Sequence, residues 1–425
     1  MSDSGTALTT EPRRFGWRRL VVEAVWVLLV VVLAALVFSV RYQDPRRVAT
    51  GDSFWYMRQA LIFSGQSVDD ATRESARLVC QDINRSAVDR DMQPTCKTYI
   101  STGFSPRYVA IFDSRPGYPL FAAPFVAVLG AWTGMMAATL LLALAAAALA
   151  YLAVWMATGL RLAGAVGSVL LFVLPSGFWM YRMLAESAVV AGCFAVLIAT
   201  MLIWRGRPIG LALVVPALAW LFTVRSASGM AVTLVMLIAA VLTLIRRPSQ
   251  VSRRGLLVTV GVAVAALALW SVLSAVLGLP SLNETIQDLA TTHYRHPDIA
   301  NPYEFLIQKN VQYWRGQIKQ VLLAPVALIA ALGAFAVLWM RMRSVAWMWI
   351  LMGLIGIMMQ VAHPARSEWG RMMLLINIPI ACALGYGAAL AIGRVRWPGS
   401  RKGLHPQPSP ISESAIAHPV PSDLP

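Results

Sequence analysis

Long apolar runs constrain this chain more than any other feature of its 425 residues. The first run, residues 20–40, exceeds the roughly 7 to 15 apolar residues of a signal-peptide core, and it is long enough to cross a bilayer as an uncleaved helix. With 58% hydrophobic and 13% charged residues, the chain lies far from the composition of soluble proteins. A cytosolic enzyme, a disulfide-rich secreted scaffold and a disordered chain are excluded, and we predict an all-α polytopic membrane protein.

The apolar pattern predicts about ten transmembrane helices. They are expected at residues 20–40, 133–158, 163–181, 187–204, 208–224, 229–245, 256–278, 321–340, 345–361 and 372–393. The stretch 119–130 is also apolar, but it is short and is interrupted by Pro119 and Pro124. We therefore do not count it as a crossing.

The basic residues indicate which helix ends face the cytoplasm. With the N-terminus inside, seventeen Lys and Arg residues fall in cytoplasmic segments, against four in short outer connections: Arg182, Arg225, Arg366 and Arg371. Both termini are therefore expected in the cytoplasm of a multi-pass cell-membrane protein, of the bacterial plasma-membrane type. The net charge of +16 is scattered in pairs between apolar blocks, so membrane lipids are expected as partners and nucleic acid is not.

These patterns divide the chain into five segments. Residues 1–19 form a cytoplasmic segment, 20–278 a transmembrane core with a large outer loop over 41–118, 279–320 a second outer loop, 321–396 the C-terminal transmembrane helices, and 397–425 a disordered cytoplasmic tail. The first outer loop is expected to bear juxtamembrane helices. Residues 301–319 resemble an amphipathic surface helix that roofs the outer cavity.

The four cysteines fall into two kinds of surroundings. Cys193 and Cys382 lie in apolar runs, where a thiol behaves as a small hydrophobe. Cys80 and Cys96 share the first outer loop, and export of that loop would favour a disulfide between them. Their spacing alone leaves two free thiols equally open.

Asp52 is the leading candidate for catalysis. It follows the first span in residues 50–61, where Gly51 permits a sharp exit and Asp52 or Ser53 is suited to cap a short helix. The aromatic and apolar side chains of that helix suit it to lying on the membrane surface: Trp55, Tyr56, Leu61 and Phe63. Asp52 is either a helix cap or a general base beside a lipid-linked substrate.

The re-entry of the first outer loop, residues 112–121, holds the second candidate. Arg115 is either an interfacial anchor or a two-pronged ligand for a phosphate, a role that the planar guanidinium fills better than an ammonium. Asp113 is expected to orient Arg115 or to serve as a second carboxylate.

The remaining ionisable groups gather at the outer ends of the spans. Arg182 and Glu186 are four residues apart, and they either pair with each other or bind substrate, together with Arg225. The segment 363–371 is either a solvated turn or part of an anion site, with His363, Arg366 and Arg371. A transporter would place such groups near mid-membrane, whereas chemistry on a lipid headgroup needs them at the interface.

No metal or cofactor is firmly indicated. His293 and His296 are three residues apart, but no third ligand lies near them in the sequence. The chain has no Gly-rich phosphate loop, no GxSxG and no Cys/His metal signature, so nucleotide hydrolysis and serine-hydrolase chemistry have no support.

Taken together, these motifs resemble the GT-C superfamily of membrane glycosyltransferases, which includes protein O-mannosyltransferases and lipid A aminoarabinose transferases. The resemblance covers about the first 230 residues and rests on Gly51-Asp52-Ser53 with Tyr56, the large first outer loop, Glu186 at the start of a later span, and the re-entry Arg115-x-Gly117-Tyr118-Pro119-Leu120. Many relatives have paired acids in the first loop or an aspartate at the place of Glu186, and this chain lacks a soluble C-terminal domain.

The resemblance implies a polyprenyl-phosphate-linked sugar donor, a lipid, glycan or protein acceptor, and outer-face transfer by single displacement. Asp52 would be the base, and Arg115, Tyr118, Arg182, Glu186, Arg225, His363, Arg366 and Arg371, with Asp113, would bind substrate. Two alternatives stay open at this point: a lipid or polysaccharide transporter or flippase, and a non-catalytic membrane scaffold of the same fold.

Overall fold

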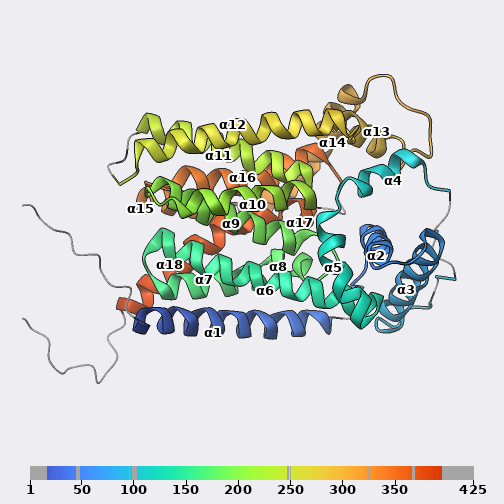
Figure 1. The fold of residues 1–425 in the computed structure, drawn as a ribbon, viewed down its shortest axis with the longest axis horizontal. Helices are drawn as coiled ribbons and strands as arrows, with labels where there is room; N and C mark the ends of the chain where they lie inside the picture. Colours follow the sequence, from blue (N-terminus) through green and yellow to red (C-terminus); the bar gives the residue numbers. More distant parts are fainter. Residues whose placement is uncertain are drawn as a thin grey trace, which may run out of the picture.

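In a computed structural model, every regular element among the described residues is a helix (Figure 1). The structure describes residues 17–44, 48–94, 96–97, 103–246, 248, 250–323, 325–365 and 369–394. The predicted all-α class is thus confirmed for this part of the chain. Most of the residues 1–19 and the whole predicted tail 397–425 lie outside it, as does Arg366.

Six helices are long and apolar enough to cross a membrane by length and composition. They are α1 (Trp17–Tyr42), α6 (Ala131–Thr158), α9 (Glu186–Trp204), α11 (Ser226–Arg246), α12 (Arg253–Val276) and α18 (Asn377–Arg394). The apolar span that contains most of α18 runs from Gly370 to Gly393. A seventh is added if α14 (Pro302–Leu323) and α15 (Val326–Arg341), which meet at 84°, form one broken span. These helices indicate a membrane protein.

The other three expected spans correspond to shorter apolar helices. They are α7 (Arg161–Val173), α10 (Ile209–Val224) and α16 (Ala346–Ala362). Helix α7 is followed by the short helix α8 (Pro175–Met180), which completes the expected span 163–181. The stretch 119–130 forms α5 (Gly117–Leu129), which is also short. Six to seven spans are therefore supported by length, and the count of ten stays a prediction.

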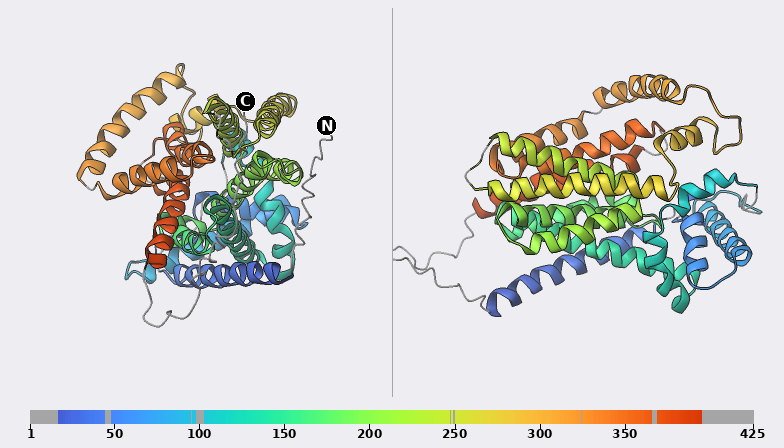
Figure 2. Two further views of the ribbon diagram at one scale, coloured as in Figure 1. Left: turned by 90° about the vertical axis from the view of Figure 1, so that its left-hand side faces the viewer. Right: turned by 45° about the horizontal axis from the view of Figure 1, so that its top comes forward.

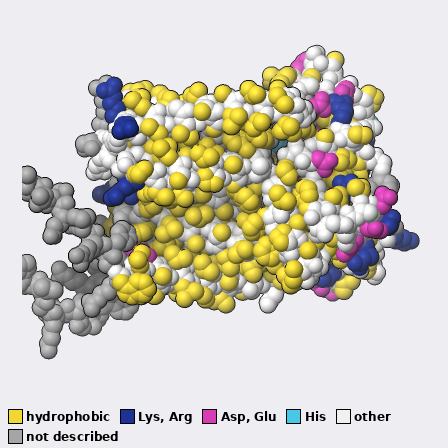
Figure 3. All heavy atoms as spheres, in the orientation of Figure 1, with side chains coloured by type: hydrophobic (Ala, Val, Ile, Leu, Met, Phe, Trp, Pro, Cys, Tyr) yellow, Lys and Arg dark blue, Asp and Glu magenta, His cyan; other side chains and the backbone are white. Residues whose placement is uncertain are grey.

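The surface of the bundle matches a membrane environment. Hydrophobic side chains cover its length, while Lys, Arg, Asp and Glu gather toward the two ends (Figure 3). On α1, Leu28 and Leu36 are 63% and 58% exposed, whereas Val30 and Ala34 are buried against neighbouring helices. Apolar side chains exposed in this way are stable in lipid and costly in water.

The centre of the bundle is α9, which packs against α6, α10 and α12. Small residues on α6 allow this close approach, among them Ala138, Ala143, Ala146 and Ala150, all of which are buried. Since lipid tails are as apolar as leucine, helices in a membrane associate largely through such close van der Waals packing.

An outer layer of short helices covers one end of the bundle, at the right of Figure 1. It contains α2 (Gly51–Phe63), α3 (Val68–Val88), α4 (Pro106–Asp113) and α13 (Leu282–Ala290). The first outer loop thus bears helices, as predicted.

The four side chains that suited α2 to a membrane surface do not form an exposed apolar face. Of these four, Trp55, Tyr56 and Leu61 are buried within the protein, and Phe63 is exposed. Trp55 stacks on Phe112 of α4 with ring centroids 5.2 Å apart. Helix α4 supplies an aromatic surface that competes with the membrane for these rings, and burial there removes more apolar area from water.

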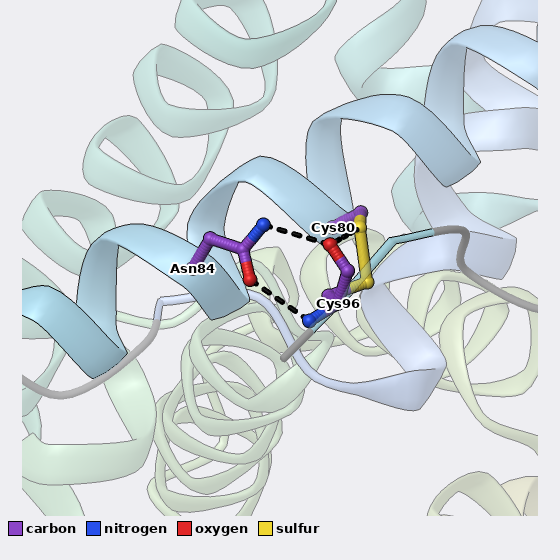
Figure 4. The surroundings of a disulfide bond; sticks show 3 residues. All are labelled: Cys80, Asn84 and Cys96. Carbon is purple, nitrogen blue, oxygen red and sulfur yellow. Dashed lines mark hydrogen bonds between the residues drawn. A yellow bond between two sulfur atoms is a disulfide. The ribbon is translucent and has the colours of Figure 1, made fainter. Parts of the chain in front are cut away.

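A disulfide between Cys80 and Cys96 closes the end of α3 onto the following segment (Figure 4). The Asn84 side chain brackets the same residue, because its Nδ2 donates to Cys96 O at 2.8 Å and its Oδ1 accepts from Cys96 N at 2.9 Å. Cys193 and Cys382 are free and buried. Of the two alternatives left by the sequence, the structure has the bonded one.

The two outer loops are joined to each other by Arg107 of α4. Its guanidinium donates to Glu284 Oε2 at 2.9 Å and to Asp298 Oδ2 at 2.8 Å, and it lies 4.4 Å from the ring centre of Tyr294. This contact fixes the second outer loop against the first, above the outer end of the bundle.

Candidate functional site

The position of Asp52 follows from how α2 begins. Thr50 is the N-cap residue, its N–H donates to Ser53 Oγ at 2.9 Å, and Ser53 Oγ donates in turn to Met183 O at 2.7 Å. These bonds anchor the first turn of α2 to the segment that precedes α9. The cap is therefore made by Thr50 and Ser53, which leaves the Asp52 carboxylate for another partner.

That partner is Arg371, which is 319 residues away in the sequence. Arg371 Nη2 donates to Asp52 Oδ2 at 2.5 Å, and Arg371 Nε donates to Glu186 Oε1 at 2.6 Å. The same Oε1 accepts from Arg225 Nη2 at 2.6 Å. Asp52, Glu186, Arg225 and Arg371 form what we call the outer ion cluster.

Each member of the outer ion cluster stands at a helix boundary. Asp52 and Glu186 lie in the first turns of α2 and α9, where the helix dipole favours a negative charge. Arg225 is the extended residue between α10 and α11. Arg371 lies on α17 (Trp369–Met372), which continues through the 3₁₀ turn η2 (Met373–Ile376) into α18.

Two glycines allow the close approaches that bring these boundaries together. A Cβ at Gly117 would lie 2.8 Å from the backbone N of Val224, the residue before Arg225. A Cβ at Gly370, the residue before Arg371, would lie 2.8 Å from Trp179 Nε1. A larger residue at either position would require a shift of the backbone at Thr223 and Val224 or of the Trp179 side chain.

The cluster is shielded from water. The side chains of Glu186, Arg371, Arg225 and Asp52 are 2%, 8%, 15% and 25% exposed. Asp52 is the most accessible of the four. Charges buried to this extent interact strongly and are destabilised when a partner is removed.

The electrostatic balance keeps Asp52 ionised. Burial alone would raise the pKa of its carboxyl, but the charge and hydrogen bond of Arg371, with the charges of Arg115 and Arg225, hold that pKa below its ordinary value. Three guanidinium groups thus act on a region that holds two carboxylates. The net positive charge favours an anionic ligand.

A pocket lies beside the outer ion cluster. It is lined by Glu186, Val189, Arg225, Ser228, Met359, Arg371, Met372, Leu374 and Leu375. Among the described residues, no group donates a hydrogen bond to Glu186 Oε2, and none bonds the buried hydroxyl of Tyr56, which interacts electrostatically with Arg225. Buried polar atoms are usually satisfied by protein or by water, so each of these two atoms can take part in one further hydrogen bond.

The other predicted site residues divide into those near the cluster and those with separate roles. Arg115 acts on Asp52 electrostatically, and its guanidinium lies 5.7 Å from the Phe112 ring centre. Asp113 accepts from Gln59 Nε2 at 2.7 Å. Tyr118 is buried, with its hydroxyl 2.7 Å from Thr139 Oγ1.

The remaining two described candidates lie at the same end of the bundle. Arg182 is 8% exposed, and its guanidinium is 4.2 Å and 4.7 Å from the ring centres of Phe178 and Trp179. The ion pairs of Glu186 run to Arg225 and Arg371, not to Arg182 as the four-residue spacing suggested. His363 ends α16, and its carbonyl accepts from Gln360 Nε2 at 3.0 Å.

Sequence reasoning had missed Gln59 and had not assigned a role to the Tyr56 hydroxyl. The signal was present, because positions 52, 56 and 59 follow the i, i+4, i+7 pattern and share one face of α2. Within the described residues, no group of three or more His, Cys, Asp or Glu side chains is placed to hold a metal ion. His293 Nδ1 lies 3.0 Å from Asp288 Oδ1.

Comparison of this chain with protein-family models, with curated proteins and with solved structures finds no match.

Proposed function

We propose that this protein is a membrane glycosyltransferase of the GT-C type, which moves a sugar from a polyprenyl-phosphate donor to an acceptor hydroxyl on the extracytoplasmic face. The observation that carries the proposal is the Asp52 carboxylate at the outer end of the bundle, 2.5 Å from Arg371 Nη2 and beside the Glu186–Arg225 pair. A carboxylate next to several cations matches what a transfer from a lipid phosphate requires.

The proposed reaction is a single displacement. The acceptor oxygen forms a bond to the anomeric carbon as the bond from that carbon to the phosphate oxygen breaks. Asp52 takes the proton of the acceptor hydroxyl, and the electron pair leaves with the polyprenyl phosphate. The leaving phosphate is a stable anion, so one base and several cations suffice.

Arg371 connects donor binding to the base. While Arg371 donates to Asp52, the carboxylate is a weak proton acceptor, because its negative charge is already stabilised. A donor phosphate would compete for the same guanidinium, while Glu186 keeps its hold on Nε. Asp52 would then gain basicity when the donor is in place. Arg115 and Arg225 supply further positive charge for the phosphate.

The proposal includes the membrane arrangement on which the sidedness depends. The chain would cross a bacterial-type plasma membrane ten times, with both termini in the cytoplasm and with Asp52, Glu186 and the Cys80–Cys96 disulfide outside. The acceptor would be a lipid, a glycan or a protein, and the sugar is open.

The test is a transfer assay with the full chain in nanodiscs. A radiolabelled polyprenyl-phosphate sugar is the donor, and a membrane extract supplies acceptors. We expect transfer by the wild-type protein and a loss of about two to four orders of magnitude in Asp52→Asn, which cannot accept the proton at neutral pH. Asp69→Asn is the matched control, because Asp69 is an exposed carboxylate on the neighbouring helix α3.

Two results would contradict the proposal. Full transfer by Asp52→Asn would remove the base from the mechanism. Absence of transfer by the wild-type protein with any donor sugar, together with movement of labelled lipid across the membrane, would identify a transporter or flippase, and absence of both would favour a scaffold.

A further inference from the structure

Helix α14 lies at a steep angle to the helix that follows it. It meets α15 at 84°, and viewed along the bundle it runs across the periphery and not along the bundle axis (Figure 2, left). Asn310 Nδ2 donates at 2.9 Å to Val361 O, near the outer end of α16. This bond places the N-terminal half of α14 at the outer end of the bundle.

One face of α14 is buried against the protein and a second face is apolar and uncovered. Tyr313 and Gln317 are 4% and 6% exposed. The uncovered stripe consists of Tyr303, Ile307, Val311, Ile318 and Leu322, which are 54%, 65%, 46%, 54% and 67% exposed. Their spacing of four, four, seven and four residues keeps them on one side of the helix over its whole length.

One edge of this stripe is basic, because Arg315 and Lys319 lie beside it and are exposed. Lys309 is exposed on the face away from the stripe, two residues from Ile307 and from Val311, and Glu304, in the first turn, is the one acidic side chain of the helix. The ammonium of Lys309 lies 5.6 Å from the Phe305 ring centre. A helix with an apolar stripe, a cationic polar edge and little net hydrophobicity is the kind that lies in the membrane interface.

We propose that α14 inserts its apolar stripe into the outer leaflet and that Arg315 and Lys319 hold the phosphates of anionic lipid headgroups. Long basic side chains reach from the apolar boundary to the phosphate layer, which suits cations at the edge of such a stripe. The stripe of a second copy is a poorer partner, because pairing by this face would bring the two cations of each copy together.

This inference does not depend on the transferase proposal, and lipid contact is its direct measure. Single cysteines carrying an environment-sensitive fluorophore are placed at Ile307 and Ile318 of the stripe, and at Gln312 on the opposite, exposed side. The native cysteines do not interfere, because Cys80 and Cys96 are bonded and Cys193 and Cys382 are buried. The chain is assembled into nanodiscs with a rising fraction of phosphatidylglycerol.

We expect the labels at 307 and 318 to be quenched by lipid-attached quenchers and the label at 312 by aqueous iodide. In the variant Arg315→Gln/Lys319→Gln, the phosphatidylglycerol fraction that gives the half-maximal change should rise, since each cation near an anionic surface adds about fivefold to affinity. Lys309→Gln, on the face away from the stripe, is the matched control and should have a smaller effect. The substituted side chains are exposed, so folding should be unaffected, and the Ile307 and Ile318 labels report insertion independently.

Three outcomes would overturn the proposal. The first is quenching by iodide at 307 and 318 to the same extent as at 312. The second is cross-linking of position 318 between two copies in place of lipid contact, which would identify a second copy as the occupant. The third is an unchanged phosphatidylglycerol dependence in the double variant, which would remove the headgroup contact.

Discussion

The two ends of the bundle each hold a cluster of carboxylate and guanidinium groups, and they differ in how completely the carboxylates are bonded. At the opposite end, which the proposed topology places in the cytoplasm and which we call the cytoplasmic end, Glu23 of α1 accepts from Arg161 Nε on Oε1 at 2.7 Å and from the Tyr151 hydroxyl on Oε2 at 2.9 Å. Both oxygens are satisfied, and the bonds join α1 to α6 and α7. Holding these three helices together is a sufficient role for this cluster.

At the outer end the bonding is uneven. Glu186 Oε1 receives both Arg225 and Arg371, whereas Oε2 receives no bond from the described residues, and a pocket lies against the cluster. Glu186 thus has one carboxylate oxygen that can accept a further hydrogen bond, whereas both oxygens of Glu23 are already bonded. The comparison indicates that the number of arginines alone does not separate a structural ion pair from a candidate site.

Removing one arginine from each end gives the largest expected contrast. In Arg371→Ala, Asp52 loses its partner and Glu186 keeps Arg225 alone. A buried charge left without compensation typically costs about 3–5 kcal/mol of folding free energy, so we expect a large fall in Tm and loss of transfer. Thermal unfolding in nanodiscs and the transfer assay measure the two effects. A variant that kept both its Tm and its activity would show that Arg371 belongs to neither the fold nor the site.

Arg115→Lys tests the outer cluster with a smaller change. The charge near Asp52 is kept, but the two-pronged contact that a guanidinium makes with a phosphate is lost. A charged hydrogen bond is worth about 1.5–3 kcal/mol, so donor affinity should fall about tenfold to a hundredfold. Affinity is measured with a labelled polyprenyl-phosphate sugar. Unchanged affinity in Arg115→Ala, with a normal Tm, would return Arg115 to the role of an interfacial anchor.

The sequence predicted the helices well, because period and length are local properties. Each expected span corresponds to an apolar helix, and the break of 163–181 into α7 and α8 occurs at Pro175, where the missing N–H and fixed φ favour a new helix start. What length alone leaves open is whether helices such as α10, with 16 residues, cross the membrane.

The sequence predicted the members of the site better than their partners. Asp52, Glu186, Arg225 and Arg371 were all candidates, because charges at the ends of apolar helices are rare. Their pairing depends on which helix boundaries meet in space, and no periodicity in one sequence relates residues 52 and 371. The four-residue spacing left Arg182 and Glu186 either as a local pair or as substrate-binding groups, and in the structure Glu186 pairs with Arg225 and Arg371.

Arg161→Ala is the matched test at the cytoplasmic end, and its effect should be much smaller than that of Arg371→Ala. The Arg161 side chain is 40% exposed, so water screens its ion pair with Glu23, and the Tyr151 bond to Glu23 is retained. We expect a slight fall in Tm and full transfer activity. An activity loss in Arg161→Ala comparable with that in Arg371→Ala would end the distinction between a structural and a functional cluster.

The smallest expected effect is the dependence of stability on pH through Asp52. Because the folded-state pKa of this carboxyl is lowered, its contribution to stability is fully present above the ordinary value of about 3.9 and is lost as pH falls through the folded-state pKa. The difference in Tm between the wild-type protein and Asp52→Asn should therefore be constant from about pH 5 to pH 8 and should shrink only in stronger acid. A difference that changed near pH 6 or 7 would mean that Asp52 titrates there in the free protein, which requires that Arg371 does not hold it. The hydrogen bond from Arg371 to Asp52 would then be absent in the protein without bound polyprenyl-phosphate sugar. Binding of that substrate could not raise the basicity of Asp52 by taking Arg371 away from it, and this step of the proposed mechanism would be removed.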